Sequence, residues 1–456
     1  MACGAVFSVR EFHEQRRSNN TSGVPGVCRV TSTAQSEGAW KRFVYHAQMN
    51  NAPAPAAPQR IPRAVWALGF VSLLMDVSSE LIHSLLPLFM LTVLGMSAFS
   101  IGVIEGVAEA TALTVKVFSG VLSDYWGRRK PLALAGYGLG ALSKPLFALA
   151  TGPGLIVTAR LIDRVGKGIR GAPRDALVAD ITPPAVRGAA FGLRQSLDTA
   201  GAFLGPLLAM ALMLLWAKDF RAVFWVAVIP AGLAVALLLF GVREPERAPQ
   251  VPGTPGTPRV NPVRRENLRR LSAAYWWVVA IGAVFTLARF SEAFLVLRAY
   301  QTGLPLAYAP LVLIAMNLVY ALTAYPFGNL SDSVSHTKLL ALGLAVLIAA
   351  DLALARDGRE AVALGVALWG LHMGITQGLL AAMVAKAAPA DLRGTAFGFF
   401  NLLSGIALLI ASAFAGFMWD WLGAQMTFLC GAGFSVAALI VLLLRGATGV
   451  RDNRAV

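Results

Sequence analysis

The chain has 456 residues, of which 57% are hydrophobic and only 14% are charged, and its mean hydropathy is +0.64. Soluble domains are about 45–50% apolar and about 25% charged, so this composition excludes intrinsic disorder and argues against a soluble enzyme. The net charge of +15 could indicate nucleic-acid binding, but the basic residues outside the apolar blocks occupy short segments between them, as in membrane proteins.

The first 60 residues contain no apolar run and become rich in Ala and Pro toward their end. They lack the apolar core of a signal peptide, so we expect a disordered cytoplasmic tail. Met49 stands shortly before Arg60 and Arg63, a basic flank that is typical of a first membrane span. A second interpretation is therefore that translation begins at or near Met49 and that residues 1–48 are absent from the native protein.

Apolar blocks of membrane-spanning length follow this segment. A helix needs about 20 apolar residues to cross about 30 Å of hydrocarbon, whereas the strands of an outer-membrane barrel would alternate in polarity. The sequence therefore predicts an all-α polytopic membrane protein with twelve transmembrane helices. We place these helices at residues 64–94, 99–121, 131–151, 154–178, 188–216, 221–241, 274–300, 305–329, 338–355, 361–386, 395–418 and 424–445.

The loop charges predict the orientation of the chain in the membrane. The loops after even-numbered spans are basic, for example at residues 128–130, whereas those after odd-numbered spans, such as 95–99, carry almost no net charge. A Pro/Gly/Arg-rich stretch at 243–272 after the sixth span reads as a flexible basic linker. By the positive-inside rule, this linker and both termini are cytoplasmic. We expect the protein to reside in the cell inner membrane.

The sequence contains an internal repeat that relates its two halves. The pattern Gly-x3-Asp at residues 120–124 recurs at 328–332, and the stretch 187–192 recurs as 393–398. Such parallel repeats form two pseudo-symmetric six-helix bundles, with the substrate bound between them near the membrane midplane. The expected organisation is a tail at 1–60, an N-terminal six-helix bundle at 61–242, the linker at 243–272, a C-terminal six-helix bundle at 273–446, and a C-terminal tail at 447–456.

The loop between the second and third spans carries the most specific motif. From Gly120 to Lys130 it reads GVLSDYWGRRK and resembles motif A of the major facilitator superfamily (MFS), although a basic residue usually stands where Tyr125 does. The resemblance covers residues 60–446 and implies the MFS fold, with a gate that bridges the two halves. Alternatively, the basic cluster only sets topology. The implied gate residues are Gly120, Asp124, Gly127, Arg128, Arg129, Gly328 and Asp332.

Two weaker motif matches lie in the fourth and fifth spans. Arg160 stands at the position of the family's motif B arginine, but Asp163 replaces the usual Gln. A pattern of small residues in the fifth span resembles motif C, which is typical of antiporters, so the resemblance is strongest to proton-coupled and antiporter-like members. Ordinary helix packing with a proline kink is the competing interpretation. The motif C-like residues are Gly192, Gly201, Gly205 and Pro206.

The spans of the first half carry many charges, eight basic against seven acidic. Each would cost about 2.5–3.5 kcal/mol at the bilayer centre, so most must pair with one another or line water. The resemblance implies that spans one, four, seven and ten line the cavity. A lone histidine such as His372 is also common as a packing residue. The candidate cavity residues are Arg160, Arg164, Lys167, Glu105, Glu109, Asp198, Arg289, Glu292, Asn317, His372 and Gln377.

Asp76, Glu80 and His83 fall at positions i, i+4 and i+7 of the first span and therefore share one helix face. Two carboxylates one turn apart disfavour double ionisation, so one of them is suited to take up a proton. We predict that these three residues couple transport to protons, with Glu80 as the central group. The alternative is that both carboxylates only neutralise the basic residues of the fourth span.

These features predict a secondary active transporter that moves a small solute by alternating access, not an enzyme. The chain lacks a GxxxxGK[ST] phosphate loop, so an ion gradient, most simply of protons, should supply the energy. The basic face of the fourth span favours an anionic substrate, because Arg binds carboxylates bidentately.

Two other functions remain open. Proton-antiport efflux of varied organic solutes would agree with the motif C resemblance, and a membrane-embedded enzyme is a remote alternative because no clustered His or Asp suggests a metal site. The three cysteines, Cys3, Cys28 and Cys430, form no metal-binding pattern. We expect a small-molecule substrate, protons and the lipid bilayer as partners, no cofactor or metal, no nucleic acid, and a monomer.

Overall fold

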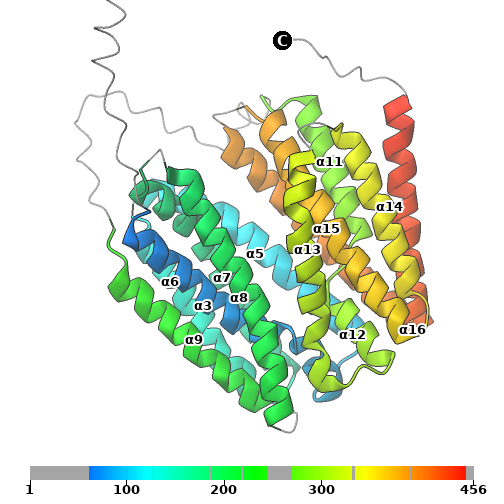
Figure 1. Cartoon of the computed structure of the whole chain (residues 1–456), viewed down its shortest axis with the longest axis horizontal. Helices are drawn as coiled ribbons and strands as arrows, with labels where there is room; N and C mark the ends of the chain where they lie inside the picture. Colours follow the sequence, from blue (N-terminus) through cyan, green and yellow to red (C-terminus); the bar gives the residue numbers. More distant parts are fainter. Residues whose placement is uncertain are drawn as a thin grey trace, which may run out of the picture. The chain divides into compact units, whose positions relative to one another are not determined.

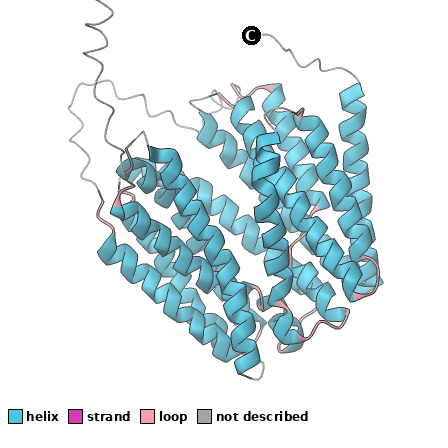
Figure 2. Cartoon of the chain, viewed as in Figure 1, coloured by secondary structure: helices cyan, strands magenta, loops and turns pink. Residues whose placement is uncertain are grey.

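The computed structural model describes residues 61–126, 128–183, 186–216, 219–244, 270–330, 334–389 and 392–447. Every regular element in these residues is helical, and Figures 1 and 2 show the helices as two neighbouring groups. The predicted N-terminal tail, the start at Met49, nearly all of the linker and the C-terminal tail lie outside the described residues.

The helices follow the predicted spans closely. The first half contains α3 (Arg63–His83), α4 (Leu86–Thr92), α5 (Ala98–Trp126), α6 (Lys130–Ala148), α7 (Pro153–Ile181), α8 (Arg187–Leu215) and α9 (Phe220–Gly241). The second half contains α11 (Ala273–Ala288), α12 (Ala293–Gln301), the short 3-10 helix η2 (Leu306–Tyr308), α13 (Pro310–Leu330), α14 (His336–Leu354), α15 (Arg359–Ala387) and α16 (Arg393–Ala447).

By length and composition, nine helical stretches in the described residues could cross a membrane, and α6 and α7 are not among them. The many charged residues of α7 account for its exclusion. One of the nine stretches lies in α16, which is divided by Gly423, where φ is 85° and ψ is 169°. Together with α6, α7 and this division, the all-α fold of twelve predicted transmembrane helices is confirmed.

The first and seventh spans are each broken at corresponding places in the two halves. α3 ends at His83 because Pro87, four residues later, has no N–H to donate and its ring clashes with the preceding turn. In the second half, α11 ends before Arg289, whose backbone is extended, and α12 begins after Glu292. Broken helices in corresponding positions of two repeats mark the binding region of many transporters.

The two halves pack against each other mainly through α5 and α16, and α8 also contacts α13. Glycines allow the close approach of α5 and α16, because a Cβ atom on Gly102 would lie 2.2 Å from the carbonyl oxygen of Ser412. We call the end where α9 ends and α11 begins the linker end, and the opposite end, which contains α4 and α12, the far end (Figure 1).

The far end is closed by a shared apolar core. One cluster of buried side chains includes Phe89 and Phe224 from the first half and Phe294 and Trp369 from the second. The three other clusters in the described residues each lie within one half. The apolar core shared by the halves therefore lies at the far end. Toward the linker end the apolar clusters are separate, although α5 and α16 remain in contact there, since a Cβ atom on Gly398 would lie 2.9 Å from Val117.

A polar contact also joins the halves at the far end. The carboxylate of Asp420 in α16 accepts hydrogen bonds from the backbone N–H groups of Ala98 (3.0 Å) and Phe99 (2.8 Å) at the start of α5. The first N–H groups of a helix have no partner within the helix, and a carboxylate there is favoured by the helix dipole. Asp420 thus caps a helix that belongs to the other half.

The same end of the second half contains an ion pair between a buried arginine and an exposed carboxylate. Arg298 lies 3.0 Å from Asp357 in the loop between α14 and α15, and Gln425 also donates a hydrogen bond to this carboxylate. These hydrogen bonds, first that from Gln425 and then that from Arg298, hold the pKa of Asp357 below its usual value.

Candidate functional site

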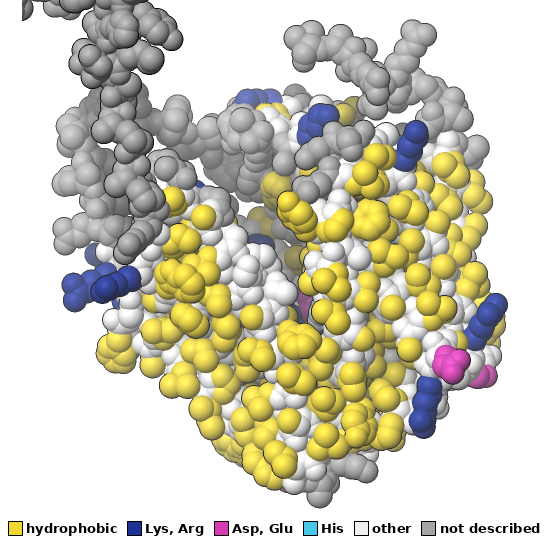
Figure 3. Space-filling model, viewed as in Figure 1, with side chains coloured by type: hydrophobic (Ala, Val, Ile, Leu, Met, Phe, Trp, Pro, Cys, Tyr) yellow, Lys and Arg dark blue, Asp and Glu magenta, His cyan; other side chains and the backbone are white. Residues whose placement is uncertain are grey.

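Two adjoining cavities lie between the halves, with volumes of about 740 Å³ and 270 Å³. The larger is lined by α3, α5, α7 and α8 and, from the second half, by α13. The smaller lies closer to the far end, next to the break between α11 and α12. Both include Glu80, Glu109 and Lys167, so they form one path, and Figure 3 shows the surface hollowed between the halves.

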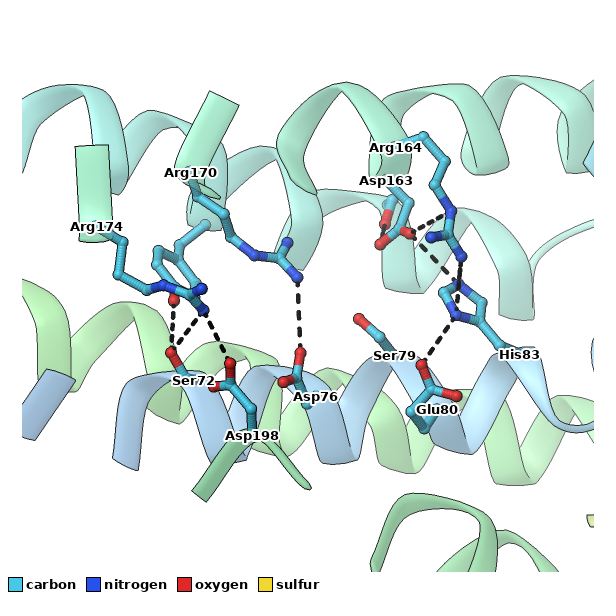
Figure 4. A network of polar contacts seen from close by, with 12 residues as sticks. Ser72, Asp76, Ser79, Glu80, His83, Asp163, Arg164, Arg170, Arg174 and Asp198 are labelled. Carbon is cyan, nitrogen blue, oxygen red and sulfur yellow. Dashed lines mark hydrogen bonds and ion pairs between the residues drawn. The ribbon is translucent and has the colours of Figure 1, made fainter. Parts of the chain in front are cut away.

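A buried cluster surrounds Asp163 of α7, which lines neither cavity (Figure 4). The Asp163 carboxylate lies 2.7 Å from Lys144 Nζ of α6 and 3.4 Å from His83 Nε2 of α3. Lys144 Nζ also donates a hydrogen bond to Ser79 Oγ at 3.0 Å. The side chains of Lys144 and Asp163 are 0% and 2% exposed, so this pair ties three helices together away from water.

Two arginines of α7 pair with glutamates of α5 beside this cluster. Arg164 lies 2.8 Å from Glu109, and Arg160 pairs with Glu105. Arg164 also contacts the ring of His83, with its guanidinium 3.0 Å from Nδ1 (Figure 4). The α5–α7 contact therefore neutralises the two arginines that lie closest to the far end.

A second network lies toward the linker end (Figure 4). Asp198 of α8 lies 2.6 Å from Arg194 and 3.7 Å from Arg174 of α7. Arg174 also donates a hydrogen bond to Ser72 Oγ of α3 at 2.9 Å. Arg170, which lies 3.9 Å from Asp76, stands over the Tyr137 ring. Ion pairs thus hold α3, α7 and α8 in register.

Three charged groups of the larger cavity are not neutralised in this way. Lys116 and Lys167 are exposed to the cavity and form no ion pair in the described part of the chain. Among the described residues, the one ion-pair partner of Glu80 is His83, at 3.7 Å. This histidine is charged only when its imidazole is protonated. The cavity wall therefore presents two ammonium groups and one carboxylate to a ligand.

The structure places most of the predicted cavity residues along these walls. The larger cavity is lined by Asp76, Glu80, Glu109, Lys167, Asp198 and Asn317. The smaller cavity adds His83, Glu105, Arg160, Arg164, Arg289 and Glu292.

His372 and Gln377 of α15 line neither of these two cavities. His372 is buried, and its Nδ1 lies 2.8 Å from the carbonyl oxygen of Gly343 in α14, which favours the packing role. Lys116 and Tyr320, which line the larger cavity, were not among the predicted site residues. Lys116 is one of the eight basic residues in the spans of the first half, but the sequence does not tell which cation lacks a partner.

A further buried carboxylate gave no sequence signal as a site. Asp351 of α14 is fully buried, and neither of its oxygens has a hydrogen-bond partner among the described residues. It lies outside both cavities, near Gly431 of α16.

The described residues of the motif A-like loop contact their own half of the chain. Arg129 lies 2.7 Å from Asp180 at the end of α7, and its backbone N–H donates a hydrogen bond to Glu244. Lys130 Nζ donates a hydrogen bond to the carbonyl oxygen of Leu239 in α9. Arg128 is exposed. Gly127, Asp332 and the side chain of Asp124 lie outside the described residues, and Gly120 and Gly328 lie near the ends of α5 and α13.

The glycines of the motif C-like pattern position the carboxylates of α3. A Cβ atom on Gly201 would lie 2.7 Å from the carbonyl oxygen of Leu73, and one on Gly205 would lie 2.7 Å from Glu80 Cβ. Gly192 has open space around it, and Pro206 lies inside α8. Gly201 and Gly205 thus let α8 pack closely beside Asp76 and Glu80, which line the larger cavity.

Comparison with known proteins places this arrangement in context. The family model described as Major Facilitator Superfamily matches residues 68–411 and 293–455. An uncharacterized MFS-type transporter of Methanocaldococcus jannaschii is 30% identical over 393 residues, which cover 84% of this chain and 95% of the relative.

Two further similarities are more limited. The multidrug resistance protein MdtH of Photorhabdus laumondii is 31% identical over 156 residues, 34% of this chain and 38% of that protein. The structure of the POT family transporter PepTSo superposes with a TM-score of 0.70 at 12% identity, covering 86% of this chain and 99% of that one. The structural similarity supports the fold.

Proposed function

Because the chain belongs to the major facilitator superfamily, we propose that this membrane transporter is a secondary active transporter that works by alternating access, couples transport to protons and moves a small anionic solute. The observation that carries the proposal is the set of three unneutralised groups, Lys116, Lys167 and Glu80, in the larger cavity. The family and its transporter relatives identify the chain as a transporter and not an enzyme.

The arrangement of the halves supports alternating access. Apolar packing and the Asp420 cap join the halves at the far end, whereas the cavity extends from Glu80 toward the linker end, where the apolar clusters are separate. The basic loop at 128–130 makes the linker end the cytoplasmic side, so that this conformation is open to the cytoplasm. We expect the protein in the cell inner membrane with both termini cytoplasmic.

Rocking of two bodies would expose the cavity to the other side. We propose residues 61–242 and 273–446 as these bodies, acting within a monomer, with the small solute, protons and the bilayer as partners. Motion of this kind must separate the contacts at the far end and form contacts at the linker end, where the motif A-like loop lies.

Glu80 is suited to proton coupling by its position. It lines both cavities together with Lys167, and its neighbour His83 is itself in contact with Arg164 and Asp163. A proton on Glu80 removes one negative charge from a wall that bears two free ammonium groups. Anion binding is then stronger in the protonated protein, and by thermodynamic linkage the anion favours protonation to the same extent.

Purified protein in proteoliposomes tests this proposal directly. With an imposed pH gradient, wild-type protein should accumulate one or more labelled organic anions from a panel, without chemical change to the solute. Glu80→Gln should exchange the same anion across the membrane but no longer concentrate it on the proton gradient. Glu360→Gln is the matched control, because Glu360 is exposed at the start of α15, outside both cavities.

Two results would contradict the proposal in different ways. Accumulation by Glu80→Gln at the wild-type level would exclude Glu80 as the coupling group. Absence of any anion flux in wild-type vesicles that do move organic cations would replace anion uptake with the second function, proton-antiport efflux of organic solutes. That second function draws on the partial similarity to MdtH and on the close packing of Gly201 and Gly205 against α3.

A further inference from the structure

The basic residues of the larger cavity divide into two classes by their partners. Arg170 is paired with Asp76, and Arg174 with Asp198 and Asp175. The two lysines of this cavity, Lys116 and Lys167, have no ion-pair partner in the described residues, and both are exposed. The arginines thus form ion pairs within the protein, whereas the two lysines (Lys116 and Lys167, the lysine pair) are available to bind a ligand.

Close packing of α5 against α7 brings the lysine pair together. A Cβ atom on Gly168 would lie 2.7 Å from Val115 Cβ and 2.8 Å from the carbonyl oxygen of Ala112, so the two helices nearly touch there. Three residues further along α7, the stem of Lys116 passes Gly171, with its Cε 3.6 Å from the position of a Cβ atom. Lys167 precedes Gly171 by four residues, about one helical turn or roughly 6 Å.

The geometry points to a small dianion as the ligand of the lysine pair, and this inference rests on the proposed transport function. When Glu80 is protonated, as the proposed coupling requires, the cavity presents two ammonium groups on neighbouring turns that have no ion-pair partner in the described residues. They repel each other, and a ligand with one negative charge neutralises only one of them. A dicarboxylate, or a compact dianion of the same charge, satisfies both. We therefore assign Lys116 and Lys167 as the specificity-determining residues that select dianions over monoanions.

The remaining lining residues agree with a ligand of this charge. Arg289 and Glu292 contribute one charge of each sign to the smaller cavity, so they add no net charge. Asn317 and Tyr320 of α13 face the larger cavity from the second half and offer neutral hydrogen-bonding groups. Lysine also suits a mobile ligand, because its ammonium is a point charge on a flexible stem and does not demand a fixed bidentate geometry.

The first test uses the unmodified protein, so it does not depend on the folding of a variant. Thermal unfolding of the purified full-length chain is measured with succinate, butyrate and sulfate at equal ionic strength. Succinate and butyrate have four carbons each but differ by one charge. An increase in Tm with succinate and no increase with butyrate therefore supports the assignment. A rise with sulfate as well indicates that charge suffices, and a rise with succinate alone indicates a dicarboxylate. Equal effects of succinate and butyrate would overturn it.

The second test measures affinity in variants. Lys116→Gln and Lys167→Gln should each weaken binding of the stabilising dianion about tenfold or more, as expected for loss of a charge-assisted contact, with little change for monoanions. Lys116→Arg keeps the charge and should retain binding. Lys386→Gln is the matched control, because Lys386 is exposed on α15 and lines neither cavity.

The outcomes separate this inference from the proposed function. Unchanged dianion affinity in both Gln variants, with anion transport intact in wild-type vesicles, refutes the lysine pair and leaves the transporter proposal standing. If wild-type protein moves no anion of any charge and no dianion raises its Tm, both are wrong. Loss of dianion preference in the Gln variants, with the control unchanged, establishes the site.

Discussion

Replacing Asp163 with Asn removes the carboxylate that compensates Lys144 in the interior of the first half. The two groups lie 2.7 Å apart with exposed fractions of 2% and 0%, and His83 lies 3.4 Å from the other carboxylate oxygen. Removing one partner of a buried ion pair costs about 3–5 kcal/mol, because the remaining charge is left uncompensated. A fold is stable by only about 5–15 kcal/mol, so Asp163→Asn should lower the Tm strongly.

Thermal unfolding of the purified protein in detergent, followed by circular dichroism, measures this effect. The double variant Asp163→Asn, Lys144→Met should recover much of the loss, because it leaves no unpaired charge in the apolar interior. Asp357→Asn is the control. The Asp357 carboxylate, which pairs with Arg298, is 75% exposed and screened by water, so only a small change in Tm is expected. An Asp163→Asn protein as stable as wild type, or a double variant no better than the single one, would refute the reasoning.

Three further predictions follow from the packing of the halves. Gly205→Leu should lower expression and Tm, because its side chain would press on Glu80, whereas Gly192→Leu should have little effect since open space surrounds Gly192; equal losses would contradict this. Asp420→Asn should weaken the cap on α5 and increase labelling of a cysteine placed at Ala98, which is buried at the far end, and unchanged labelling would show that apolar packing alone closes this end. In intact cells, a membrane-impermeant maleimide should label a cysteine at Ser97 but not one at Thr254, and equal labelling would overturn the proposed topology.

The number and positions of the spans could be predicted from the sequence because the hydrocarbon core imposes a fixed length on each apolar block. Even α7 was found in this way, although its charges keep it from qualifying as a membrane helix by composition. A period of about 3.6 residues puts Arg160, Asp163, Arg164 and Lys167 on one side of α7. In the structure Arg160 and Arg164 pair with glutamates of α5, and Lys167 lines the larger cavity.

The helical period of the sequence does not indicate which of these charged residues form ion pairs. By its position on the helix Asp163 falls among the basic residues of α7, yet its carboxylate pairs with Lys144 of α6 at 2.7 Å and lines neither cavity. His372 was indistinguishable in sequence from a cavity residue, but in the structure it is bound to the backbone of α14. Residues on one helix face share a direction, but their partners come from other helices.

The sequence by itself determined the class of protein, the twelve helices, the two related halves and the concentration of charge in the first half, because these depend on composition, block length and repetition along one chain. Only the tertiary structure decided which end is closed and which charges remain free. Glycines at 102, 168 and 205 set how closely α5, α7 and α8 approach their neighbours. Those approaches pair the arginines and leave Lys116 and Lys167 facing the cavity, since an ion pair depends on a few ångströms between helices that the linear order of residues does not specify.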